Sequence, residues 1–403
     1  MFDLLIRNTS EVVTCTGSGS PEEMLAPIKG GVVGITDGKI TFLGTDAPGP
    51  AKYELDARGG FVGPGFVDCH THVVFAGDRS AEFEQRTQGR SYLEIAASGG
   101  GIARTVTATR AASEEELFKL ALPRLERLLR HGVTTAEVKS GYGLDVDSEL
   151  RILRVIRRLG TQQPVSLVGT LLALHAIPPE FKEHRAGWVR LVIDELLPRV
   201  ASEKLARFND VFVEQTAFTH DEAREVLSAG AKLGLLPRLH VDQLTANGGA
   251  QLAASLNAVT ADHLEQISPE GIAALAKAGT VAVLAPTSTL FAKARPFAPG
   301  RALREAGVRV ALCTNCNPGS SHSENVFLSL GLACVENGLT PAEAYLGFTR
   351  FGADAIADST LGRLQLGAPA DVVLFNADSY RALPYHFAMN DVAHVIKSGE
   401  LVF

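Results

Sequence analysis

The chain has 403 residues, 46% of them hydrophobic and 21% charged, and this balance excludes wholesale disorder. Its formal net charge is −7 and no dense run of Lys and Arg occurs, which argues against a nucleic-acid or membrane-surface partner. The sequence has neither a run of ~20 apolar residues nor a signal-peptide core. Its five cysteines suit a reducing compartment. We therefore expect a soluble cytoplasmic enzyme.

Short β-like runs fill the first 60 residues and return near the end of the chain. Asp37-Gly38 and Ser398-Gly399 separate such runs and are typical of hairpin turns. We therefore predict one small β-sandwich domain that is assembled from both ends of the chain, residues 1–64 and 366–403.

Residues 65–365 alternate between strand-like apolar runs and helical periods. Ser113 and Glu116 form the capping box of one intervening helix, and Ser268 is the expected N-cap of another. Eight β/α units predict a (β/α)₈ barrel, whose catalytic groups sit at the C-terminal ends of the strands. A doubly wound open sheet is the alternative, but no GxGxxG follows the first strand. The eight runs are 66–75, 133–138, 164–172, 210–215, 236–244, 256–264, 280–288 and 308–315.

Histidine or asparagine side chains stand at the ends of four of these runs. His70 and His72 are spaced i, i+2, so both imidazoles point to the same face of the strand and can bind Zn²⁺ or Fe²⁺. His240, His263 and Asn315 end the fifth, sixth and eighth runs. A single strand-end histidine is more often a core residue, but four coincidences at one end of a barrel favour a metal site. His175, just past the third run, is expected to donate a hydrogen bond to a substrate.

Five stretches of sequence, spread over most of the predicted barrel, resemble the amidohydrolase superfamily and, within it, the imidazolonepropionase family. The resemblance implies hydrolysis of the cyclic amide bond of 4-imidazolone-5-propanoate to N-formimino-L-glutamate, a step of histidine degradation. It also implies one Zn or Fe ion and a homodimer. The matching stretches are 68–102, 134–145, 171–181, 239–249 and 317–321.

The resemblance also implies roles for single residues. His70, His72 and His240 look like metal ligands, and the family places an aspartate at position 315 as the fourth. His263 resembles the histidine that assists proton transfer, and we count Gln243 with it as a catalytic candidate. The residues that the resemblance places around the substrate are Arg79, Tyr142, His175, Gln243, Asn317, Gly319 and Ser320.

Two of these assignments have a physical rationale. Arg79 could clamp the substrate carboxylate with two parallel hydrogen bonds, which a lysine could not do as well. The Asn317–Ser321 loop could offer backbone N–H groups to an anion.

A metal lowers the pKa of water that it binds from 15.7 to ~7, which makes a nucleophile available at neutral pH.

Position 315 departs from the family pattern because it holds a neutral asparagine. An amide oxygen coordinates a metal weakly and cannot accept a proton. We therefore expect weaker metal binding and badly impaired catalysis. The intact surroundings argue against the drift of a pseudoenzyme, and they favour deliberate replacement of an aspartate over a natural variant.

Three other functions stay open. A dihydroorotase or hydantoinase has a two-metal site bridged by a modified lysine after the fourth strand, where this chain has Glu214 and no lysine. A purine or pyrimidine aminohydrolase carries a Glu close behind the fifth-strand histidine, where this chain has Gln243. The neutral Asn315 also allows a non-catalytic metal- or ligand-binding protein.

Overall fold

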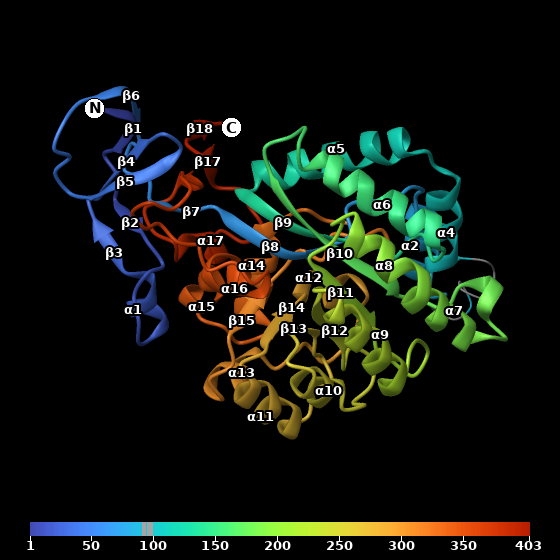
Figure 1. The fold of residues 1–403 in the computed structure, drawn as a ribbon. Coiled ribbons are helices and arrows are strands. Elements are labelled where there is room, and N and C mark those ends of the chain that lie inside the picture. Colours follow the sequence, from blue (N-terminus) through green and yellow to red (C-terminus); the bar gives the residue numbers. More distant parts are fainter. Residues whose placement is uncertain (91–93, 95–99) are drawn as a thin grey trace.

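The computed structural model describes residues 1–90, 94 and 100–403, so residues 91–93 and 95–99 of the 68–102 stretch lie outside the described part. A barrel of strands and helices forms the larger part of the molecule. Two small sheets lie beside it, and both chain termini are on their side (Figure 1).

The predicted barrel is confirmed. Within the described residues, eight parallel strands form one sheet in which each strand pairs with the next one along the chain. Each strand falls on one of the runs identified in the sequence. They are β8 (Phe66–Thr71), β9 (Val133–Lys139), β10 (Ser166–Leu174), β11 (Phe208–Phe212), β12 (Leu236–Val241), β13 (Thr260–His263), β14 (Val281–Leu284) and β15 (Val310–Leu312).

Backbone hydrogen bonds between the first strand and the chain that follows the last strand close this barrel. The N–H of Asn315 donates to the carbonyl of His70 at 3.1 Å, and the N–H of His72 donates to the carbonyl of Cys316 at 2.9 Å. Closure therefore brings position 315 directly against the His70–His72 pair.

Helices surround the barrel strands, and the expected caps are present. Ser113 and Glu116 form the capping box of α5, while the Ser268 side chain caps α11 with Pro269 in its first turn. Among the described residues, no helix is long and apolar enough to cross a membrane. The helices of this layer are α2 (Ser80–Thr87), α4 (Ile102–Ala111), α5 (Glu114–Arg130), α6 (Val146–Leu159), η1 (Pro179–Phe181), α7 (Arg185–Leu191), η2 (Val192–Leu196), α8 (Leu197–Ser202), α9 (His220–Lys232), α10 (Gly249–Ser255), α11 (Pro269–Ala278), α12 (Pro286–Phe291), α13 (Gly300–Glu305), α14 (Val326–Val335), α15 (Pro341–Phe348), α16 (Arg350–Ala355) and α17 (Ala382–Tyr385).

The two ends of the chain pair with each other, as predicted for the β-sandwich. One small sheet runs in the order β5-β4-β1-β6, and the other in the order β18-β17-β16-β7-β2-β3, with α1 (Pro21–Leu25) between β2 and β3 in the chain. The division at residues 64/65 and 365/366 stays a prediction. The strands are β1 (Phe2–Arg7), β2 (Glu11–Val13), β3 (Pro27–Lys29), β4 (Val32–Thr36), β5 (Lys39–Gly44), β6 (Ala51–Asp56), β7 (Val62–Pro64), β16 (Val372–Phe375), β17 (Val392–Lys397) and β18 (Glu400–Leu401).

Specific pairings make this second sheet possible. Antiparallel pairing of β7 with β16 sets Pro64 opposite Val372, so the N-terminal and C-terminal segments share one ladder.

The turn residues between β4 and β5 and between β17 and β18 have positive φ, as in the type I′ turns that suit tight hairpins. Both predicted hairpins are therefore confirmed.

Aromatic packing joins the small sheets to the barrel. Phe61 stacks on Phe375 with ring centroids 4.4 Å apart, and Phe66 of β8 lies 5.6 Å from Phe375. Tyr345 of α15 meets Phe66 edge-on at 5.8 Å. The strand that carries the His70–His72 pair thus begins in a fully buried aromatic cluster.

Removal of the Phe375 ring should destabilise the whole protein. We expect Phe375→Ala to lower the free energy of unfolding by about 3–5 kcal/mol, because the buried ring leaves a cavity between the sheets and the barrel. Guanidinium denaturation measures this loss. Tyr53→Ala, at a side chain that is 74% exposed, is the control and should change stability by less than ~0.5 kcal/mol. Equal effects of the two substitutions would contradict the role of the aromatic cluster.

Candidate active site

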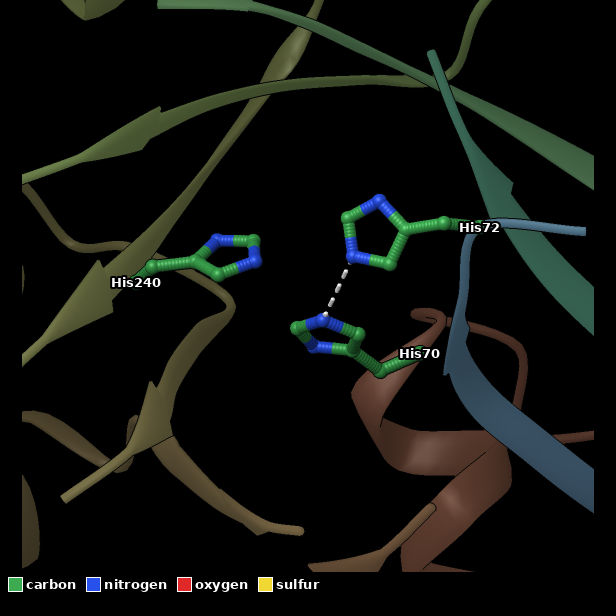
Figure 2. Close-up of side chains that lie close together, drawn as sticks. All are labelled: His70, His72 and His240. Atoms are coloured by element: carbon green, nitrogen blue, oxygen red, sulfur yellow. Dashed lines mark hydrogen bonds between the residues drawn. The ribbon is translucent and has the colours of Figure 1, made fainter. Parts of the chain in front are cut away.

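Three imidazoles converge at the mouth of the barrel (Figure 2). His70 and His72 come from the end of β8, and His240 comes from β12 on the facing side. Their candidate ligand atoms all lie within 4.8 Å of one another, and the Nε2 atoms of His70 and His72 are 3.3 Å apart. A tetrahedral zinc ion with bonds of ~2.0–2.1 Å holds its ligand atoms about 3.3 Å apart. This spacing therefore suits a metal ion.

Buried carboxylates hold the outer nitrogens of two of these rings. The Nδ1 of His70 lies 2.6 Å from Oδ2 of Asp262, and the Nδ1 of His240 lies 3.1 Å from Oδ1 of Asp210. A carboxylate accepts hydrogen bonds, so each Nδ1 carries the proton and each Nε2 presents a lone pair to the centre. The Nε2 of His240 is buried and has no hydrogen-bond partner among the described residues. Carboxylate–histidine pairs of this kind are typical of metal ligands, and the residues present fit a bound metal ion.

The three rings are held in the neutral form that a metal needs. Burial, reinforced by neighbouring positive charge, keeps the pKa values of His70 and His72 well below the ordinary range. Burial also lowers the pKa of His240, although Asp210 opposes this effect. Because a ligand histidine must be deprotonated to bind, these shifts leave the site ready for metal at neutral pH.

Five fully buried charged side chains lie beneath the histidines: Glu137, Lys139, Asp210, Arg238 and Asp262, which we call the buried charge cluster. The Lys139 ammonium lies 2.8 Å from both Oε1 of Glu137 and Oδ2 of Asp210, and 3.7 Å from Oδ2 of Asp262. The guanidinium of Arg238 lies 3.0 Å from the same Asp262 oxygen. Burial of one ion costs several kcal/mol, so the opposite charges must offset one another here.

The pKa values in the buried charge cluster follow from this mutual attraction. Burial alone would lower the pKa of Lys139, but the carboxylates around it outweigh burial and raise that pKa. Burial would raise the pKa values of Asp210 and Asp262. His240 and Lys139 outweigh burial at Asp210, and Arg238, the hydrogen bond with His70 and Lys139 outweigh it at Asp262, so both pKa values lie below the ordinary range. Both aspartates therefore stay ionised as hydrogen-bond acceptors for His240 and His70.

A cavity at the barrel mouth gathers most of the site residues predicted from the sequence. His70 lies beside it through its contact with His72. Arg79 and Gly319 line a neighbouring cavity, which is bounded by the same loop that holds Asn317 and Ser320. The predicted residues that line the first cavity are His72, Tyr142, His175, His240, Gln243, His263, Asn315, Asn317 and Ser320.

Glu82 occupies one edge of the Arg79 guanidinium, and the clamp on a substrate carboxylate stays a prediction. The Nε and Nη2 atoms of Arg79 both lie 2.9 Å from Oε2 of Glu82, a buried carboxylate of α2. Its Nη1 atom faces the 317–320 loop, where a Cβ added at Gly319 would come within 2.5 Å of it. Glycine at 319 therefore leaves the room that the Arg79 guanidinium needs against this loop.

His175 is placed at the site, but as an acceptor rather than the expected donor. Its Nδ1 lies 3.0 Å from the carbonyl oxygen of Gly141, which can only accept, so Nδ1 carries the proton. Burial and the neighbouring His240 lower the pKa of His175 to about 4. The neutral ring therefore offers Nε2 as a hydrogen-bond acceptor.

The backbone N–H groups expected to bind an anion are used within the loop itself. Those of Gly319 and Ser320 each donate to Oδ1 of Asn317 at 2.8 Å. The Nδ2 of Asn317 donates to Oδ1 of Asn315 at 3.2 Å, and Asn315 has a φ of 48°. Asn317 thus fixes both the loop and the amide at position 315.

His263 lies beside the three histidines with an unused nitrogen. Its ring centroid is 5.2 Å from that of His240 and 5.5 Å from that of His70. Its Nδ1 is buried, 3.9 Å from Oε1 of Glu265, and has no hydrogen-bond partner among the described residues. The backbone φ of 84° is a strained conformation for a histidine, and such strain is found at functional positions.

Sequence reasoning missed the buried charge cluster. The signal was present in the alternation of β9, where Glu137 and Lys139 are two residues apart in an otherwise uncharged strand. Arg238 and His240 repeat this spacing in β12. Residues at i and i+2 of a barrel strand share a face, so charges at these positions point into the barrel.

Comparison with known proteins decides the family. A sequence profile described as "Amidohydrolase family" matches residues 75–403. Imidazolonepropionase from Myxococcus xanthus is 59% identical, over 100% of this chain and 97% of its own length. That from Anaeromyxobacter sp. (strain K) is 50% identical, over 99% and 96%. The chain belongs to the imidazolonepropionase family of amidohydrolases. Membership of this family makes it a hydrolase.

Solved structures similar to this imidazolonepropionase family member agree in fold. A 5-methylcytosine deaminase from Klebsiella pneumoniae has a TM-score of 0.76 at 16% identity, over 99% of this chain and 97% of its own. An adenosine deaminase from Xanthomonas campestris with bound zinc has a TM-score of 0.72 at 17% identity, over 99% and 92%. At such identities the likeness shows the amidohydrolase-type barrel and no more.

Loss of one histidine of the cluster should abolish metal binding. We expect His240→Ala to lower metal content after dialysis from about one equivalent to near zero, because two nitrogen ligands do not fix a metal in a site built for three. Elemental analysis of the purified protein measures the content. His131→Ala is the control, since the His131 ring contacts the Arg127 carbonyl at the end of α5. Retention of a full equivalent by the His240 variant would contradict this site.

Proposed function

We propose that this chain is an imidazolonepropionase that hydrolyses 4-imidazolone-5-propanoate to N-formimino-L-glutamate. The observation that carries the proposal is the 59% identity to an imidazolonepropionase over the full chain. The cavity geometry supports it. Polar groups that can contact a polar cyclic substrate line the two cavities: three neutral imidazoles, an unbonded histidine nitrogen and, in the neighbouring cavity, a guanidinium.

The metal would be one zinc or iron ion held by His70, His72 and His240. Nitrogen ligands suit both metals. The Oδ1 of Asn315 lies at the edge of the same cavity and is the candidate fourth ligand, a weak one because it is neutral. When bound, such an ion supplies Lewis acidity, which lowers the pKa of water from 15.7 to ~7.

The side chains around the cavity would then carry the proton transfers. The oxygen of a water molecule attacks the ring carbonyl carbon, and the imidazole of His263, which lines the cavity, takes the proton. The amide C–N bond breaks as His263 returns that proton to the leaving nitrogen, which gives a carboxylate and the formimino nitrogen. A positioned acid–base group of this kind contributes typically 10²–10⁴-fold in rate.

Substrate orientation would depend on both cavities. Arg79 would bind the propanoate carboxylate beside Gly319, while Glu82 holds one edge of the guanidinium. The Nε2 of His175 would accept a ring N–H of the substrate. Tyr142, Gln243, Asn317 and Ser320 would complete the wall around the ring.

Location and assembly are also proposals. We propose a cytoplasmic location, which is supported by five unpaired thiols in the described part of the chain. The homodimer and the lack of nucleic-acid or membrane partners stay predictions from the sequence.

Restoring a carboxylate at position 315 should raise the activity. We expect the unaltered protein to form N-formimino-L-glutamate slowly, and Asn315→Asp to raise kcat/KM by about 10²–10⁴-fold, since an aspartate can both bind the metal and accept a proton. Product formation from 4-imidazolone-5-propanoate, in zinc- or iron-loaded protein, measures this.

Asn337→Asp is the matched control, because Asn337 is also buried but donates to the Ala298 carbonyl away from the cavity. A full rate in the asparagine form would show that residue 315 is not the base. The absence of product from both forms would overturn the proposed function.

Arg79 should matter for substrate binding more than for the chemical step. In the Asn315→Asp background, we expect Arg79→Lys to raise KM about 10–100-fold with kcat little changed, because a hydrogen bond to a charged group is worth ~1.5–3 kcal/mol. Steady-state kinetics separates the two constants. Arg58→Lys, on the exposed surface of the small sheets, should leave both unchanged. An unchanged KM in the Arg79 variant would exclude the carboxylate contact.

A further inference from the structure

We propose that Lys139 is a positioning residue of the metal centre, whose single ammonium group orients two of the three ligand histidines at once. The inference rests on the proposed metal centre at His70, His72 and His240. It concerns how the chain builds that centre, and it does not depend on the identity of the substrate.

Two chains of contacts begin at the Lys139 ammonium. One runs through Oδ2 of Asp210, at 2.8 Å, and from Oδ1 of that residue to Nδ1 of His240, at 3.1 Å. The other runs to Oδ2 of Asp262, at 3.7 Å, which lies 2.6 Å from Nδ1 of His70. Lys139 belongs to β9, whereas these aspartates lie in β11 and β13, so the ammonium ties together strands that are not neighbours in the barrel.

These two series of contacts, to His240 and to His70, depend on Lys139 to different degrees. Asp262 has a second cation, because the Arg238 guanidinium lies 3.0 Å from its Oδ2. Among the described residues, Asp210 has Lys139 as its one lysine or arginine within ion-pair distance. Loss of the ammonium should therefore disturb His240 more than His70.

The surroundings of Lys139 direct its ammonium group at the carboxylates alone. It is fully buried, and its hydrogen bonds go to Glu137 and Asp210. Without it, the buried charge cluster would hold three carboxylates against one guanidinium. The aspartates would then repel each other and turn away from the Nδ1 atoms that they hold, because an uncompensated buried charge is strongly unfavourable.

Cobalt(II) binding to the full-length protein tests the proposal without any substrate. We expect Lys139→Met to weaken cobalt affinity about 10–100-fold, the effect typical of losing a contact behind a metal ligand, and to change the visible ligand-field spectrum. Chelator competition gives the affinity. Lys397→Met is the matched control, since Lys397 forms a similarly shielded ion pair with Asp371, at 2.6 Å, in the small sheets. That variant should keep both the affinity and the spectrum.

A combined variant separates positioning from general destabilisation. Because Lys139 acts on His240 through Asp210, Lys139→Met with Asp210→Asn should weaken cobalt binding about as much as the stronger single variant. Independent structural damage would instead multiply the two effects, and that result would overturn the proposal. If Lys139→Met does not fold, Lys139→Gln keeps a donor for Asp210 without the charge and allows the same comparison.

The remaining outcomes are distinct. Cobalt affinity and spectrum unchanged in the folded Lys139 variant would overturn the role of Lys139 and leave the metal centre intact. Failure of the unaltered protein to bind cobalt would overturn the metal centre itself, and with it this inference.

Discussion

Hydrogen bonds between two histidine Nδ1 atoms and two buried aspartates set the chemistry of this barrel. They fix which nitrogen of His70 and of His240 carries the proton, and so which nitrogen faces the centre. Both aspartates stay ionised because buried cations offset their charge. Were either carboxylate neutral, its histidine could turn or change its tautomer, and three convergent lone pairs would no longer meet. The fold therefore stabilises an expensive set of buried charges in order to present neutral ligands.

The 315–321 segment connects this centre to the substrate side. Its first residues close the barrel by backbone bonds to His70 and His72, which places the Asn315 amide beside the metal ligands. The side-chain Oδ1 of Asn317 then accepts the N–H groups of Gly319 and Ser320 and so folds the loop. The close approach of Arg79 to Gly319 follows from that turn. One short segment thus sets barrel closure, a candidate ligand and part of the wall of the cavity that Arg79 lines.

Much of this could be predicted from the sequence, for reasons that are local. Apolar runs mark the barrel strands, capping residues such as Ser113 mark helix starts, and the i, i+2 spacing of His70 and His72 fixes a shared face. What could not be predicted depends on which partner each side chain contacts, even within a few residues along the chain. The pairing of Arg79 with Glu82, the use of Gly319 and Ser320 N–H groups by Asn317, and the direction of the His175 hydrogen bond each require knowledge of where side chains meet. The buried charge cluster was missed for the same reason, although its alternating charges were visible.

We propose that the Nε2 atoms of His70, His72 and His240 form the metal site while Nδ1 of two of them stays on carboxylates. Anomalous diffraction from zinc-soaked crystals tests it directly. The account predicts one zinc peak within bonding distance of the three Nε2 atoms, with Asp210 and Asp262 still bonded to the histidines. A second group, Asp210, His240 and Asp262, also has ligand atoms within 4.8 Å of one another, but its carboxylates already surround Lys139. A zinc peak at that group, or none among the histidines, would contradict the account.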